Sequence, residues 1–212
     1  MTLNPKANQP NGNPPLPISK GLTGNAYWPP VKPGNPWDSF LRTNWSRYQS
    51  ATLGTVSHGK EIAAALNARM GIALHGDRGT GKTYALVAAF VYLAEMGADA
   101  LLVSEADLYD QLRRDMEREP WEDRMVDRYL TVEALLIDDL GKANVTAWTA
   151  SAFFNVIDTR YRRGLVTCIT SNFWGDDLAA AIDRQGNQGR AIVDRLGEMC
   201  GVLAFTGESL RV

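Results

Sequence analysis

The stretch IALHGDRGTGKTYAL, Ile72 to Leu86, decides the fold of this chain. A short apolar run ends at a glycine, and a glycine-rich turn then leads into an apolar pattern with helical spacing. The turn matches G-x-x-x-x-G-K-[S/T] at every position, and the matching residues are Gly76, Asp77, Arg78, Gly79, Thr80, Gly81, Lys82 and Thr83. A strand, a glycine-rich loop and a helix in this order predict a loop that binds phosphate groups.

Each kind of residue in this loop has a physical reason to be there. Gly76 and Gly81 permit a tight turn whose backbone N–H groups point at phosphate oxygens, and Gly79 removes a further side chain. We expect the Lys82 ammonium to reach the β- and γ-phosphates and the Thr83 hydroxyl to bind Mg²⁺. The expected cofactors are therefore ATP and Mg²⁺.

Outside this loop, short apolar runs alternate with helical patterns. We predict strands at residues 71–76, 100–104, 134–138, 165–171 and 201–207. We predict helices at residues 58–70, 81–97, 105–119, 145–163, 176–182 and 189–199. This alternation favours an α/β fold, in which helices cover both faces of a parallel sheet.

The composition limits the domain count and the class of protein. The chain has 212 residues, of which 45% are hydrophobic and 22% charged, so it can hold one ordinary domain and a tail. Its net charge of −2 excludes DNA binding through the field of the whole protein. Nine of the ten prolines lie at or before Pro36, which predicts an extended or disordered arm over residues 1–44. The arm carries aromatic residues that either dock on the chain's own domain or bind a partner: Tyr27, Trp28 and Trp37.

The cysteines and the apolar segments bear on the cellular compartment. Cys168 and Cys200 lie far apart in apolar surroundings, which is typical of two buried thiols in a cytoplasmic protein. No secretory signal is visible, and charges interrupt every apolar stretch before it could span a membrane. We expect a cytoplasmic protein without membrane contact.

Polar residues follow two of the predicted strands where ligands bind in open parallel sheets. In ALLIDDLG, Asp138 is expected to hold Mg²⁺ opposite Thr83, and Asp139 to polarise the attacking water. The alternative is a pair of turn-forming aspartates. In CITSN, Asn172 could orient that water against the γ-phosphate, although an asparagine there could also cap a helix or form a turn.

Four segments together resemble the AAA+ ATPases of the DnaC/IstB group, which comprises bacterial and phage helicase loaders and transposition helper ATPases. These segments are GDRGTGKT, LLIDDLG, ITSN and RAIVDRLGEMCGVLAFTGESLR, and the resemblance covers residues 45–212. It implies a three-layer P-loop NTPase domain with sheet order 5-1-4-3-2 and no C-terminal lid domain. Many AAA+ proteins have Asp-Glu where this chain has Asp138-Asp139, which bears on the rate of hydrolysis.

The resemblance also implies roles and partners. Asn172 would be the sensor I residue, and Arg195 would be the arginine finger that enters a neighbouring protomer's site, with Arg190 as its substitute. Protomers would thus associate through their ATP sites. The partner would be a replicative helicase or a transposase. Arg113 and Arg114 would face single-stranded DNA, although a solvated charged helix face is the alternative.

Three other functions stay open at this point. The first is a transposition helper in place of a helicase loader. The second is a small-molecule kinase, for which the run Arg160, Arg162 and Arg163 could form a lid, although we expect these arginines to be a solvated helix end. The third is a module that binds ATP without hydrolysing it.

Overall fold

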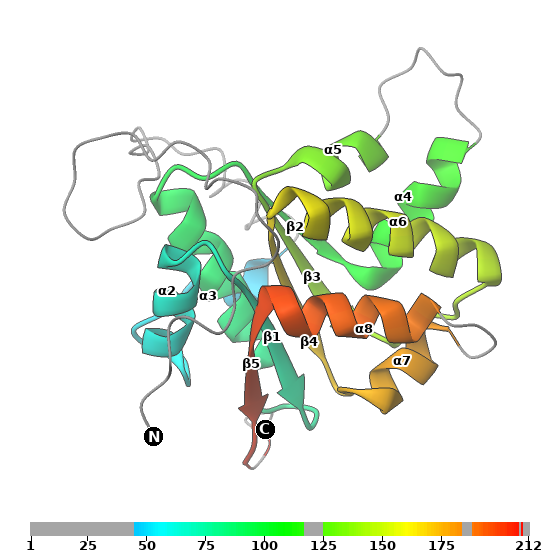
Figure 1. The fold of residues 1–212 in the computed structure, drawn as a ribbon. Coiled ribbons are helices and arrows are strands. Elements are labelled where there is room, and N and C mark those ends of the chain that lie inside the picture. Colours follow the sequence, from blue (N-terminus) through cyan, green and yellow to red (C-terminus); the bar gives the residue numbers. More distant parts are fainter. Residues whose placement is uncertain (1–44, 117–124, 184–187, 208, 210–212) are drawn as a thin grey trace.

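The computed structural model describes residues 45–116, 125–183, 188–207 and 209. The predicted arm over residues 1–44 and Pro120 lie outside the described residues. The elements, shown in Figure 1, are η1 (Ser46–Tyr48), α2 (Gly59–Asn67), β1 (Gly71–Gly76), α3 (Lys82–Glu95), β2 (Ala100–Ser104), α4 (Glu105–Met116), α5 (Met125–Thr131), β3 (Ala134–Leu140), α6 (Ala147–Arg163), β4 (Val166–Ser171), α7 (Asp176–Ile182), α8 (Gln188–Met199) and β5 (Cys200–Phe205).

The five strands form one sheet in the order β2-β3-β4-β1-β5, and every neighbouring pair is parallel. This is the predicted order read from its other end, so the expected topology is confirmed. Ala73 of β1 lies opposite Ile169 of β4 and Val202 of β5. Because all strands run the same way, their carboxyl ends share one edge of the sheet.

Helices cover both faces of the sheet (Figure 1). On one face, α2 and α3 pack against strand residues such as Leu74 and Leu136. On the other face, α4 to α8 pack against Ala73 and Leu135, the residues that precede Leu74 and Leu136 in the strands. Successive strand residues thus enter opposite cores, which is why the strands are apolar at nearly every position. The three-layer prediction is confirmed.

The element boundaries follow local signals. The strands at residues 71–76 and 100–104 and the helix at 176–182 have the predicted bounds. Gly164 ends α6 in the left-handed conformation at φ +62°, and Thr146 caps its start by accepting the Thr149 N–H. Helix α5 was not predicted. In the described chain, no helix combines the length and the apolar character that crossing a bilayer requires.

Arg160 corrects one prediction. We expected it on a solvated helix end, but its side chain is fully buried. Its guanidinium donates to the carbonyl oxygens of Tyr129, Val132 and Val166 and to the Thr167 hydroxyl, at 2.6–3.0 Å. Burial lowers its pKa to about 10. It joins α5 and α6 to the amino-terminal end of β4, opposite the sheet edge where the strands end.

Candidate nucleotide-binding site

The phosphate loop connects β1 to α3 and depends on three glycines with positive φ. Gly76 has φ +136°, and a Cβ there would lie 2.1 Å from the Phe205 carbonyl oxygen of β5. Gly79 and Gly81 have φ +84° and +95°. Gly81 is the N-cap of α3, and because it has no side chain, the first N–H groups of that helix remain accessible to an anion.

Lys82 is held inside this loop. Its side chain is only 5% exposed, and its ammonium donates to the carbonyl oxygens of Gly76 and Asp77 at 2.8 and 2.7 Å. Burial lowers the pKa of Lys82, an effect that Asp139 opposes and that Lys142 reinforces. The amine is therefore partly desolvated, and charges of both signs surround it.

Asp138 and Thr83, the residues expected to bind Mg²⁺, lie in contact. The Thr83 hydroxyl donates to Asp138 Oδ2 at 3.3 Å, and the Thr170 hydroxyl donates to Oδ1 at 2.6 Å. Burial raises the pKa of Asp138, and the two hydroxyl groups counteract this shift. Mg²⁺ binds few protein oxygens and keeps several waters, so one carboxylate oxygen beside one hydroxyl fits this ion. Thr170 belongs to the ITSN motif, which did not indicate this role for it.

Asp139 lies at an irregularity in β3. The pairing between β3 and β4 shifts between Ile137 and Leu140, and Asp139 has φ +63°, which is uncommon for an L-residue with a side chain. Its N–H donates to the Thr170 hydroxyl at 2.8 Å. Its carboxylate Oδ1 lies 2.6 Å from the Lys142 ammonium.

These residues surround a cavity of about 510 Å³ at the carboxyl edge of the sheet. Its lining includes, from the predicted site, Arg78, Gly79, Gly81, Lys82, Thr83, Asp139 and Asn172. Gly76, Asp77 and Thr80 belong to the loop but not to the lining, and the Thr80 hydroxyl donates to the Asp77 carbonyl at 2.9 Å. Asp138 is buried behind Thr83.

The structure adds residues to this lining that the sequence motifs did not indicate. Arg47 and Tyr48 come from η1, and Tyr84 comes from the first turn of α3. The Tyr48 and Tyr84 rings lie 6.3 Å apart, and the Tyr84 hydroxyl lies 3.1 Å from the Ser50 hydroxyl. Lys142, in the loop after β3, is the fourth addition. The residues preceding α2 therefore form one wall of the cavity.

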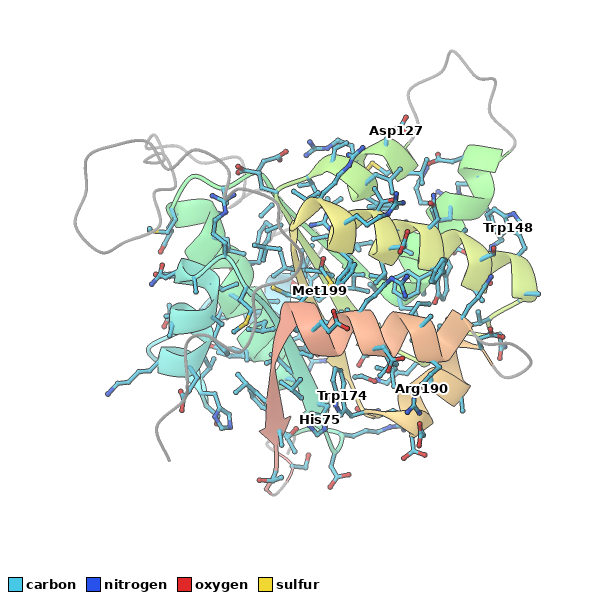
Figure 2. All side chains as sticks on the ribbon, in the orientation of Figure 1. His75, Asp127, Trp148, Trp174, Arg190 and Met199 are labelled. Carbon is cyan, nitrogen blue, oxygen red and sulfur yellow. The ribbon has the colours of Figure 1, made fainter. Side chains whose placement is uncertain are left out.

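A stacked pair lies beside the loop. His75 of β1 and Trp174, which follows β4, have ring centroids 5.7 Å apart and nearly parallel planes (Figure 2). Burial lowers the pKa of His75, and the Lys82 charge acts in the same direction. The contact joins the strand before the phosphate loop to the segment that carries Asn172.

The two arginines expected to act on a neighbouring protomer lie outside the cavity lining. Arg195 of α8 is 27% exposed and binds Asp158 of α6 through Nε and Nη2, both at 2.8 Å, while its guanidinium lies 4.9 Å from the Phe154 ring centroid. Arg190 is exposed (Figure 2). It pairs with Asp176 and Asp194. Within this protomer, neither arginine contributes to the site.

The fold and this site define a P-loop NTPase of the AAA+ class. The model of the IstB-like ATP binding protein family matches residues 53–212. The chain belongs to this family and is an ATP-binding protein, which confirms the predicted resemblance.

Two curated proteins and one solved structure show where the similarity lies. The chain is 28% identical over 109 residues to the replicative helicase loader DnaI of Bacillus subtilis (strain 168), covering 51% of this chain and 35% of DnaI. It is 27% identical over 138 residues to an insertion sequence IS232 putative ATP-binding protein of Bacillus thuringiensis subsp. berliner, covering 65% and 54%. The alignments thus span about a third and about half of these relatives. A crystal structure of DnaI superposes with a TM-score of 0.63 at 27% identity, covering 76% of this chain and 90% of that one.

Proposed function

We propose that this chain hydrolyses ATP with Mg²⁺ and uses the cycle to act on a replicative helicase bound to DNA. The observation that carries the hydrolytic part is the convergence of Lys82, Thr83, Asp139 and Asn172 on one cavity, with Asp138 bonded to Thr83 behind it. This set holds a cationic phosphate contact, oxygen ligands for a metal, a carboxylate and an amide. Phosphoryl transfer requires little beyond such positioning and charge stabilisation.

Each group has a distinct role in this proposal. Lys82 leaves the carbonyl oxygens of its own loop and binds the β- and γ-phosphates. Thr83 and Asp138 hold Mg²⁺, which supplies charge neutralisation for the phosphates when it is bound. The Asp139 carboxylate accepts a hydrogen bond from the attacking water, and the Asn172 amide orients that water against the γ-phosphate.

Replacing Asp139 by Asn tests the hydrolytic role. The amide keeps the shape of the side chain but is a poor proton acceptor, so nucleotide binding should persist while steady-state release of phosphate falls. Phosphate release that is near zero in both the wild type and Asp139→Asn would instead support a module that binds ATP without turning it over, and equal but substantial release would remove Asp139 from the mechanism.

The helicase part of the proposal is supported by the similarity to DnaI, a replicative helicase loader. In this proposal, ATP joins protomers through Arg195, which must leave Asp158 to enter the neighbouring site. Arg113 and Arg114 on the exposed side of α4 would bind single-stranded DNA. Arg113 pairs with Asp110 on the same helix, so DNA would compete with that carboxylate.

The experiment is light scattering with ATP or ADP, with single-stranded DNA present. A larger particle with ATP than with ADP supports the switch, and a monomer under both conditions contradicts it. If the Asp139→Asn variant retains a replicative helicase when ATP is bound and not otherwise, that helicase is the partner.

A transposition helper is the second candidate. It is favoured by the IS232 protein, whose alignment covers more of this chain than that of DnaI does. Binding to the transposase of a neighbouring insertion element, with no retention of helicase, would establish it.

A further inference from the structure

Glu105 is a buried carboxylate that the proposed chemistry does not use. It begins α4 directly after β2, and it is only 2% exposed. Its Oε1 accepts the Gly141 N–H at 2.9 Å, and its Oε2 accepts the N–H groups of Lys142 and Ala143 at 2.8 and 2.7 Å. Three consecutive backbone donors of the loop after β3 therefore converge on one side chain 36–38 positions earlier in the chain.

The loop held by Glu105 carries the partner of Asp139. Lys142 is the middle residue of the three, and its ammonium lies 2.6 Å from Asp139 Oδ1. Asp139 itself has φ +63° at the irregularity in β3, where the regular strand pairing does not fix its direction. Its N–H is fixed by Thr170, so the backbone of Asp139 is anchored on one side and the loop on the other.

We propose that Glu105, through the 141–143 loop and Lys142, positions the Asp139 carboxylate at the cavity. This inference rests on the proposed function, because it assigns Glu105 a task only if Asp139 acts on the attacking water. Glu105 is a positioning residue in this arrangement: it holds the loop, and Lys142 of that loop contacts Asp139. Because Glu105 also begins α4, it links the proposed DNA-binding helix, through the 141–143 loop, to the hydrolytic residue.

The two contacts differ in strength. The bonds to Glu105 are charge-assisted and part-buried, whereas the pair of Lys142 and Asp139 has side chains that are 36% and 42% exposed. An exposed ion pair contributes little alone, so the loop contacts of Glu105 should control the position of Asp139. Misplacing a reacting group by about 1 Å can reduce a rate on the order of 100-fold.

The test compares Glu105→Gln and Lys142→Met with matched surface variants. The glutamine amide can accept on one side only and turns its NH₂ toward the loop donors on the other, so at least one of the three bonds is lost. Glu61→Gln and Lys60→Met remove the same charges from exposed positions of α2. The measurements are kcat and KM for MgATP in steady state, with thermal melting to establish that each variant folds.

We expect kcat of Glu105→Gln to fall roughly tenfold or more, with KM for ATP nearly unchanged, because the nucleotide contacts stay intact. Lys142→Met should lose a smaller factor in kcat, and Lys142→Arg should restore it. The control variants should have the kcat and KM of the wild type. If Glu105→Gln does not fold, the Lys142 variants decide the question.

Several results would overturn the inference. One is a Glu105→Gln variant that folds and keeps the wild-type kcat. Another is a raised KM at constant kcat, which would make the loop a nucleotide contact. A rise of kcat in Lys142→Met would show that the lysine restrains Asp139. A wild type without ATP turnover would overturn both this inference and the proposed hydrolysis, whereas turnover unaffected by these substitutions would overturn the inference alone.

Discussion

Replacing Thr170 by Val removes one hydroxyl that holds both acidic residues of the site. Valine has nearly the shape of threonine, so at this fully buried position the packing is retained and two hydrogen bonds are lost. One bond is donated to Asp138 Oδ1 at 2.6 Å, and the other is accepted from the Asp139 N–H at 2.8 Å. The first leaves a buried carboxylate with one donor fewer, and the second leaves a backbone donor without its acceptor.

The magnitude follows from these two losses. A hydrogen bond to a charged group contributes about 1.5–3 kcal/mol, and a buried donor left without a partner costs about 1–3 kcal/mol. We expect Thr170→Val to lower the free energy of unfolding by about 3–5 kcal/mol. For a domain of this size, that loss lowers Tm by roughly 6–20 °C. Since small domains have about 5–15 kcal/mol in total, most of the variant should still fold.

The destabilisation by Thr170→Val should also depend on pH. Burial raises the pKa of Asp138, and the Thr170 hydrogen bond counteracts this, so the variant raises that pKa further. A carboxyl whose pKa is higher in the folded state favours folding when protonated, and this contribution is lost as the pH rises through the folded pKa. The difference from the wild type should therefore be largest near neutral pH and smaller in mild acid.

Urea unfolding followed by tryptophan fluorescence, with a chelator and without nucleotide, measures both effects. Thr131→Val is the control, because its exposed hydroxyl donates only to the Asp127 carbonyl. It should change the free energy of unfolding by less than about 0.5 kcal/mol. The reasoning would be refuted if Thr170→Val lost as little free energy of unfolding as the control. It would also be refuted if the loss were equal at neutral pH and in mild acid.

Four further predictions concern other positions. Lys82→Ala should abolish binding of a fluorescent ATP analogue, because the β- and γ-phosphates lose their cation; unchanged binding would invalidate the site. Arg160→Met should lower the free energy of unfolding by about 3–5 kcal/mol in chemical denaturation, since three buried carbonyls and a hydroxyl lose their donor. Arg195→Ala should slow hydrolysis only at protein concentrations where protomers associate; an equal loss in dilute monomer would place its action within its own protomer. Burial raises the pKa of Cys168 to about 12 and that of Cys200 well above its usual value, so alkylation of either thiol should require unfolding, as mass spectrometry can establish.

The fold was predictable because its elements have strong local patterns. Each strand contains a short run rich in apolar residues, and α6 has a capping threonine and a terminal glycine. Helix α5 was missed because its seven residues span two turns, which is too short for a helical period to stand out.

The sequence indicated candidate site residues only where several of them are consecutive in the chain. The phosphate loop and the Asp138-Asp139 pair are such cases. Thr170, Glu105 and Arg47 were not assigned a role, because their contacts depend on strand register, on the irregularity in β3 and on how η1 meets α3. Arg160 was misassigned for a related reason: an arginine satisfied by backbone carbonyls has no partner that the sequence can show.

The charges around the cavity indicate how a nucleotide would bind. Arg47, Arg78, Lys82 and Lys142 are among the residues that line it, while Asp139 is the single acidic side chain among the described lining residues. Lys82 already donates two hydrogen bonds to neutral carbonyls of its own loop. Phosphate oxygens would replace these bonds between a cation and neutral carbonyls with contacts between opposite full charges, which attract each other more strongly in a partly desolvated site. In the proposed binding mode, phosphate binding would therefore exchange the partners of Lys82, and its gain would be the difference between the two sets of bonds. The same exchange frees the loop carbonyls, so nucleotide affinity and the conformation of the phosphate loop are linked through this one side chain.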